Sequence, residues 1–324
     1  MKFSTATLIL LIFTASISLR AQTQPPLGRQ PDDEVIRFST NLVTVPAIVK
    51  TRQGGYIPNL RREDFRIYED GVEQEISSFE TVDKPFTVTL MLDMSDSARI
   101  KLGDIKNAAI AFLNQLRPED RALIIAFDKR FALLTEATSN RKVLSEAIRG
   151  VKTGGGTALY DSIDAIINAK LKQVPGRRAI VILTDGIDTS SVRATYESTL
   201  RSATEQYALI YPIQYPNDAA AKQPNDQFGT VTYTTPSGEP LNKAYERGTR
   251  YLQLIAETSG GHFQYSDNLK NLEQSFARIA EELRQQYGLS YYPKNPGPKN
   301  GKRRIKVIVG VPYAVVHARD SYAH

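Results

Sequence analysis

The central part of the chain alternates between continuous apolar runs and amphipathic segments. The runs at 86–93 (FTVTLMLD), 179–185 (AIVILTD) and 208–215 (ALIYPIQY) are almost entirely apolar, as is typical of strands buried on both faces of a parallel sheet. Segments with apolar residues at helical spacing occupy 98–116, 141–149, 158–172, 193–206, 251–258 and 269–286. This alternation predicts an α/β fold, a doubly wound, mainly parallel sheet with helices on both faces.

Shorter strand patterns without intervening helices occur near both ends of the chain. The segment 65–79 (FRIYEDGVEQEISSF) contains Asp70-Gly71, a dipeptide typical of tight hairpin turns. After residue 287, strand patterns recur in YGLSYYP, RRIKVIVGV and YAVVHARDSYA. Isolated hairpins are marginally stable, so strands from the two ends are expected to pair. The sequence therefore predicts one small β module that is built from both termini, with the α/β domain inserted in it. A further hairpin is expected between 122–128 and 131–137.

The first residues have the pattern of a secretory signal. Lys2 supplies a basic start, an apolar stretch follows from Ala6 to Leu19, and Ala21 is a plausible cleavage point. The alternative is an N-terminal anchor that is not cleaved. A stable membrane span is not expected once the signal is removed, and the body of the protein is expected to be secreted or periplasmic. The predicted organisation is a signal peptide at 1–21, a flexible lead-in at 22–34, the first part of the β module at 35–84, the α/β domain at 85–286 with a polar insertion at 216–248, and the second part of the β module at 287–324.

Composition narrows the possible chemistry. The chain has no cysteine and three histidines, which excludes thiolate metal sites and cysteine nucleophiles. Its formal charge of +6 falls to +4 without Lys2 and Arg20. Because the basic residues are interspersed with acids, nucleic acid is not an expected partner. No G-x-S-x-G elbow or Walker sequence is present, so the glycines at 154–156 are interpreted as a turn. His262 is interpreted as a structural residue.

Five oxygen-bearing residues lie where strands and turns end. Asp93, Ser95 and Ser97 follow the first apolar run, Thr157 follows a glycine turn, and Asp185 ends the run AIVILTD. Open α/β sheets bind ligands at the carboxyl ends of their strands. Hydroxyl and carboxylate oxygens suit Mg²⁺, Mn²⁺ or Ca²⁺ and are a poor set for zinc or copper. The alternative is that these residues only cap helices and turns.

The order Asp-x-Ser-x-Ser, a later Thr after a glycine turn, and Thr-Asp-Gly resembles the metal-ion-dependent adhesion site of von Willebrand factor A domains. The resemblance covers roughly residues 86–285. The flanking segments TNLVTVPAIV, EDFRIYEDGVEQEI and RIAEELRQQYGLSYYP resemble secreted von Willebrand factor A-related proteins of Acidobacteria. The resemblance implies that Ser95, Ser97 and Thr157 bind the ion directly, and that Asp93 and Asp185 act through water. Asp96 departs from the pattern, since the family commonly has Gly there.

The resemblance implies a protein-binding function, in adhesion or assembly, in which an acidic residue of the partner, Glu or Asp, completes the coordination of the ion. No pair of residues suggests general acid–base catalysis, so an enzyme is not expected. One alternative is a hydrolase that uses the same ion, with Asp96 or Asp188 as its base. Another is a structural module without metal. The basic stretch 294–306 is interpreted as lysine protection of a hairpin edge, with contact to an anionic membrane or polysaccharide as the alternative.

Overall fold

The computed structural model describes residues 42–205, 208–217, 233–266, 268–295 and 301–323. The chain divides into two units, and all described residues belong to the second, Thr40–His324. The first unit lies outside the described residues, as do the predicted signal peptide, the lead-in and the first residues of the predicted β module. All statements below concern the second unit.

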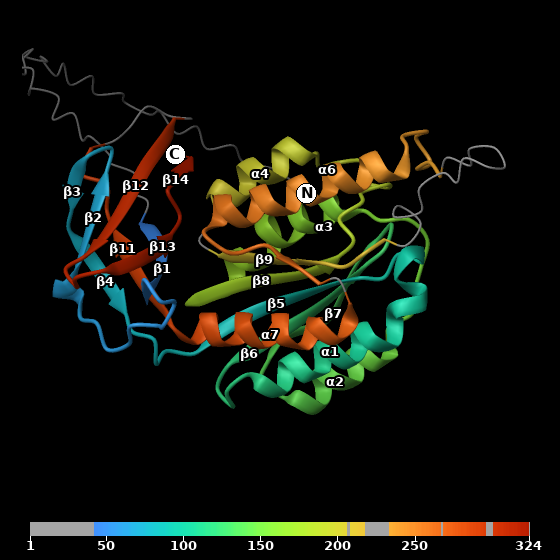
Figure 1. Ribbon diagram of the computed structural model, residues 1–324, viewed down its shortest axis with the longest axis horizontal. Helices are drawn as coiled ribbons and strands as arrows, with labels where there is room; N and C mark the ends of the chain where they lie inside the picture. Colours follow the sequence, from blue (N-terminus) through green and yellow to red (C-terminus); the bar gives the residue numbers. More distant parts are fainter. Residues whose placement is uncertain (1–41, 206–207, 218–232, 267, 296–300, 324) are drawn as a thin grey trace, which may run out of the picture. The chain divides into compact units, whose positions relative to one another are not determined.

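A six-stranded sheet forms the centre of the α/β domain (Figure 1). Its strand order is β10-β9-β8-β5-β6-β7, and only β7 runs antiparallel to its neighbour. Every residue of β5 is buried, which explains its apolar composition. The strands are β5 (Phe86–Asp93), β6 (Arg121–Phe127), β7 (Phe131–Thr138), β8 (Arg177–Thr184), β9 (Leu209–Gln214) and β10 (Gln264–Tyr265). The predicted fold class and the β6–β7 hairpin are confirmed.

Helices cover both faces of this sheet. Apolar residues of α1, α2 and α7 pack on one face, and those of α3, α4 and α6 pack on the other (Figure 1). The helices are α1 (Leu102–Gln115), α2 (Arg141–Gly150), α3 (Leu159–Ala165), α4 (Tyr196–Glu205), α6 (Leu241–Ser259) and α7 (Leu269–Arg284). Two of the predicted helices are only partly α-helical. The helix predicted at 98–116 begins with a 3₁₀ segment, Asp96–Lys101, which precedes α1. The helix predicted at 158–172 continues after α3 as a π turn and a 3₁₀ turn.

Helix α6 begins at Leu241, ten residues before the helix expected from the sequence. Its first turns are polar on the solvent side, and only Ala244 and Gly248 are buried there. Gly248 packs directly on the turn after β8, since an added Cβ would lie 2.2 Å from the Gly186 carbonyl oxygen. The end of the predicted polar insertion is therefore helical, whereas residues 218–232 lie outside the described residues.

Strands from both ends of the chain form a second, all-antiparallel region. One sheet has the order β13-β1-β11-β4 and the other β14-β12-β2-β3, and their apolar faces share one core. The strands are β1 (Val43–Thr51), β2 (Phe65–Glu69), β3 (Val72–Gln74), β4 (Ile76–Glu80), β11 (Gln286–Tyr291), β12 (Lys302–Val309), β13 (Ala314–Ala318) and β14 (Ser321–Ala323). The expected pairing of the two ends is confirmed by β1, which pairs with β11 and β13.

Two segments expected as single strands each divide between the two sheets. The segment VEQEISSF forms β3 and β4, and YAVVHARDSYA forms β13 and β14. The Asp70-Gly71 turn is as expected, with φ angles of 48° and 85°. A strand that changes sheet closes the corner of a sandwich, so these breaks are part of the architecture.

A buried charge network joins the two sheets of the β region. The Glu69 carboxylate is 1% exposed and accepts hydrogen bonds from the hydroxyls of Tyr291 and Tyr322, at 2.5 and 2.8 Å, and from the Arg303 guanidinium. Arg303 also pairs with Asp70 at 2.6 Å. A buried carboxylate is tolerated only when its oxygen atoms are satisfied, and here two hydroxyls and one guanidinium supply the donors.

The β region is also bonded to the α/β domain. The Arg177 side chain, at the start of β8, donates to the carbonyl oxygens of Val82, Lys84 and Leu283. Only Gln285 separates α7 from β11. No helix among the described residues is long and apolar enough to cross a membrane.

Candidate functional site

The five residues singled out in the sequence meet at the carboxyl edge of the central sheet. Asp93 is the last residue of β5, and Asp185 directly follows β8. These strands are parallel neighbours with Leu92 opposite Leu183, so the two carboxyl groups lie side by side. Both residues are almost fully buried, with exposures of 0% for Asp93 and 1% for Asp185.

Each carboxylate is held by neighbouring donors. Asp93 accepts the backbone N–H of Ser95 at 3.0 Å and the hydroxyl of Thr184 at 2.6 Å. Asp185 accepts the N–H of Ile187 at 3.0 Å, the Ser97 hydroxyl at 2.7 Å and the Asn217 amide at 2.7 Å. Among the described residues, neither carboxylate forms an ion pair. The site therefore holds two carboxyl groups in fixed positions without an ion pair among the described residues, although the nearby Lys101 ammonium lowers the pKa of Asp185 in part.

Both serines project from the turn that follows β5. Ser95 precedes the 3₁₀ segment Asp96–Lys101, and its hydroxyl lies 3.0 Å from that of Ser97. This tight turn brings alternate residues to the same side, as the Asp-x-Ser-x-Ser spacing predicts. Ser95 is buried, whereas Ser97 is exposed.

Thr157 reaches the same place from the glycine turn. Its N–H donates to the Thr189 hydroxyl at 2.8 Å, and its carbonyl accepts the N–H groups of Thr189 and Ser190. The glycine turn also packs closely on the loop after β6. Gly154 is required at this contact, because an added Cβ would lie 1.7 Å from an Asp128 carboxylate oxygen. The glycine run thus lets the turn lie against the loop after β6, and fixes Thr157 at the site.

An open pocket of about 440 Å³ lies over these residues. Ser95, Ser97, Thr157 and Asp185 line it, and Asp93 lies below them against Thr184. Apolar residues form part of the rim, including Ile100, which is 89% exposed. The structure thus brings together all five predicted residues.

Two polar residues of the site lie beyond β9 and were not expected from the sequence. Asn217 donates to Asp185, as described above. Tyr215 is fully buried, and its hydroxyl makes no hydrogen bond of normal geometry among the described residues, although the hydroxyls of Ser97 and Ser95 lie close enough to lower its pKa in part. Burial, then the nearby carboxylates of Asp93 and Asp185, raise the pKa of Tyr215. Only the order of the strands, with β9 beside β8, brings these residues to the site; no local motif marks them.

The acids considered as alternative bases are engaged elsewhere. Asp96 is exposed and pairs with Arg99. Asp188 accepts the N–H groups of Tyr160 and Ser191 and the Ser191 hydroxyl, which fixes the loop after β8. His262 lies outside the pocket, with its Nδ1 2.6 Å from a Glu282 oxygen.

Electrostatics at the site favour the uptake of positive charge. Burial, and then the neighbouring Asp185, raise the pKa of Asp93 from its ordinary value of 3.8 to about 7. Burial also raises the pKa of Asp185. Among the described residues, no cluster of three or more His, Cys, Asp or Glu is present, so any ion here would rely on hydroxyls and water as well as carboxylates. The oxygen-only donors and the unpaired Tyr215 hydroxyl fit a hydrated hard cation.

These features define a class of protein, an α/β domain with an oxygen-rich pocket at the carboxyl edge of a mainly parallel sheet. Residues 88–188 match the family model described as von Willebrand factor type A domain. The von Willebrand factor type A assignment therefore holds for residues 88–188, which include most of β5, the serine turn, Thr157 and Asp185.

Parts of the chain are also similar to known proteins. An uncharacterized protein of Synechocystis sp. is 33% identical over 106 residues, which is 32% of this chain and 25% of that protein. A UPF0353 protein of Mycolicibacterium paratuberculosis is 24% identical over 241 residues, 69% of this chain and 67% of that protein. The solved von Willebrand factor type A structure from Catenulispora acidiphila has a TM-score of 0.50 at 10% identity and covers 88% of this chain and 72% of that one. It supports the fold alone.

The first prediction concerns pH. Because the folded-state pKa of Asp93 is raised, the cation-free protein binds a proton that the unfolded chain has already lost, and stability falls as pH rises from about 4 to about 7. Asp93→Asn should flatten this slope and raise the free energy of unfolding near neutral pH by about 2–4 kcal/mol. Denaturant unfolding in EDTA measures the free energy of unfolding of both proteins across this pH range. If the stability of the variant depends on pH as that of the natural protein does, the raised pKa does not belong to Asp93.

The second prediction concerns the unpaired hydroxyl. Tyr215→Phe removes one buried polar atom and keeps the ring, so in EDTA the variant should be more stable by about 1–3 kcal/mol. Tyr251→Phe is the matched control, because its hydroxyl is also buried but lies 2.8 Å from the Thr199 hydroxyl. This control should lose stability. If both variants lose stability, the Tyr215 hydroxyl has a hydrogen-bond partner and the prediction is wrong.

Proposed function

We propose that the pocket binds one divalent cation, Mg²⁺, Mn²⁺ or Ca²⁺, and that this domain binds a protein partner through it. The observation that carries the proposal is the pair of buried carboxyl groups at the floor of an open pocket, with no ion pair among the described residues. Two buried carboxylates repel each other and are costly to ionise, and a cation between protein oxygens offsets both costs.

Ser95, Ser97 and Thr157 are the proposed direct ligands. Asp93 and Asp185 are held by Thr184, Ile187 and Asn217 in positions suited to hydrogen-bond water on the ion. The Tyr215 hydroxyl faces the same region and is proposed to hydrogen-bond this water. With few charged direct ligands the ion keeps a strong positive field, and carboxylates are the preferred ligands of such hard cations. A Glu or Asp of the partner is therefore proposed to complete the site.

The surroundings of the pocket support binding over catalysis. Ile100 is almost fully exposed beside Ser97 and offers an apolar contact next to the ion. For hydrolysis, a base beside the ion is needed, but Asp96 is paired with Arg99 and Asp188 fixes a loop. No observation therefore favours the hydrolase alternative. We place this function outside the cytoplasm, on the signal-like residues 1–21 of the sequence.

The third prediction tests the cation. Mg²⁺, Mn²⁺ or Ca²⁺ should raise the thermal midpoint of the chain from residue 22 onward, relative to EDTA. A ligand present at a hundredfold excess over its Kd stabilises the native state by about 2.7 kcal/mol. Asp185→Asn and Ser97→Ala should lose this rise, and Tyr215→Phe should retain part of it.

Glu146→Ala is the control for the cation experiment, because Glu146 is an exposed acid on α2, away from the pocket. It should respond to cation as the natural protein does. If the natural protein shows no cation-dependent rise with any of the three ions, the proposed site is wrong.

The fourth prediction tests the partner chemistry. A displayed random peptide library is captured on the immobilised protein in Mg²⁺ and eluted with EDTA. The eluted peptides should be enriched about tenfold or more in Asp or Glu at one position, which corresponds to about 1.4 kcal/mol. Selection on Asp185→Asn serves as the control. Equal enrichment on both proteins would exclude recognition through the ion.

A further inference from the structure

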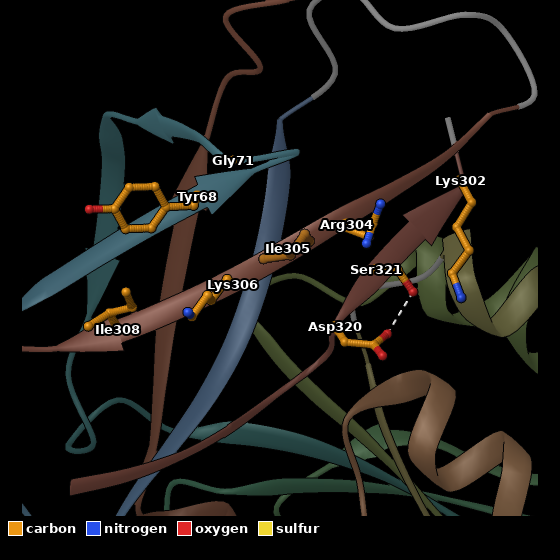
Figure 2. A pocket seen from close by; sticks show the side chains of 9 residues that line it. All are labelled: Tyr68, Gly71, Lys302, Arg304, Ile305, Lys306, Ile308, Asp320 and Ser321. Carbon is orange, nitrogen blue, oxygen red and sulfur yellow. Dashed lines mark hydrogen bonds between the residues drawn. The ribbon is translucent and has the colours of Figure 1, made fainter. Parts of the chain in front are cut away.

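A second candidate binding site lies on the outer face of the β region. A groove of about 770 Å³ runs along β12, between the β2–β3 turn and the start of β14 (Figure 2). Strand β12 alternates between exposed and more buried residues, so Lys302, Arg304 and Lys306 all lie on the outer face. The buried residue between the first two, Arg303, points inward to Glu69. The strand thus lines the groove with a cation at every second position, three in all.

These cations have no acidic partners in the described part of the chain. None of the three side chains forms an ion pair there, although nine other lysines and arginines outside this strand do. Lys302, Arg304 and Lys306 line the groove with a single carboxylate, Asp320. Asp320 accepts the Ser321 hydroxyl at 2.7 Å, as Figure 2 shows. The groove therefore carries an excess of positive charge.

Protection of an open sheet edge does not account for this arrangement. Strand β12 lies between β14 and β2 in the sheet order. Lys302 lies opposite Ala323 and Arg304 opposite Ser321, so the edge beside these two cations is already paired with β14. Lysines that discourage edge pairing are useful only where an edge is open. The interpretation of the 294–306 stretch as edge protection is thus wrong for Lys302 and Arg304.

We propose that this groove binds an extended acidic segment of a protein partner. Charges at alternate residues of β12 are about 6.6 Å apart along the strand, and alternate side chains of an extended peptide have the same spacing. A peptide with Asp or Glu at every second position therefore places one carboxylate near each cation. Side chains on its other face remain in solvent.

The lower end of the groove in Figure 2 is less polar and fits a peptide with an apolar end. Tyr68 lies opposite Lys306 in the β2–β12 register, and Ile308, which is 40% exposed, lies beyond it. A concave groove with an apolar end favours a peptide over a flat anionic membrane. The groove shares no lining residue with the pocket over Asp185. It is therefore a second contact that does not depend on the cation.

The experiment measures fluorescence anisotropy in EDTA, which keeps it separate from the cation site. The probe is a labelled peptide with five glutamates alternating with threonine. A peptide with five glutamates at every third position has the same charge at the wrong spacing. The protein variant is Lys302→Gln/Arg304→Gln/Lys306→Gln. The control variant is Lys142→Gln/Lys172→Gln/Arg201→Gln, which removes three exposed charges from other elements.

The alternating peptide should bind the natural protein and the control variant with Kd values within about twofold, and the groove variant at least about tenfold more weakly. Its binding should also weaken as salt is raised from about 0.05 to 0.5 M. Circular dichroism establishes that both variants are folded. Equal binding to the groove and control variants, or equal affinity for the two peptides, would overturn the proposal. Tighter binding to polygalacturonate or to phosphatidylglycerol vesicles, lost in the groove variant, would also overturn it and assign the groove to another class of ligand.

Discussion

The parallel pairing of β5 with β8 is the constraint on which the candidate site depends. It places Asp93 and Asp185 beside each other, at the edge of the sheet where the parallel strands have their carboxyl ends. The cost of burying two carboxyl groups is visible in the raised pKa of both. A pair of apolar residues would be more stable there, so the buried carboxyl groups are what the proposed cation site has to explain. The hydrogen bonds from Thr184 and Asn217 hold the carboxyl groups in place, so that the site is formed before any ligand arrives.

Much of the fold follows from local pattern. Apolar runs with oxygen-bearing ends identify β5 and β8, and the spacing Asp-x-Ser-x-Ser needs only the tight turn that follows. Tyr215 and Asn217 could not be found in this way, because their role depends on β9 being the neighbour of β8. The start of α6 was missed for a related reason. Its first turns carry few apolar residues, and they are helical because Gly248 packs against Gly186, a contact between distant parts of the chain. The strand divisions at Glu75 and Asp320 likewise follow from the closure of the sandwich, which no local sequence pattern reports.

The chain presents two surfaces with opposite electrostatic character. At the edge of the central sheet, acids are buried below an open pocket, and positive charge is needed to neutralise them. On β12, cations are exposed and lack acids. Both surfaces favour carboxylates on a partner, one through an ion and one directly. An acidic partner is therefore the chemistry that the two proposals share, although each stands on different residues and is tested under different conditions.

The pairing of β1 with β11 and β13 has a consequence for the order in which the molecule acquires its structure. Val43 lies opposite Tyr291, so β1 has no neighbouring strands until β11 and β13 have been synthesised. The α/β domain between them contains all of its own strands and helices and makes its contacts earlier. Closing so long a loop carries an entropic cost that the intervening domain reduces once it is folded, because it holds the two ends of the loop near each other. During synthesis, β1 to β4 are thus an exposed set of strands that depends on β11 to β14 for protection, and removal of β11 to β14 would leave apolar edges free to aggregate.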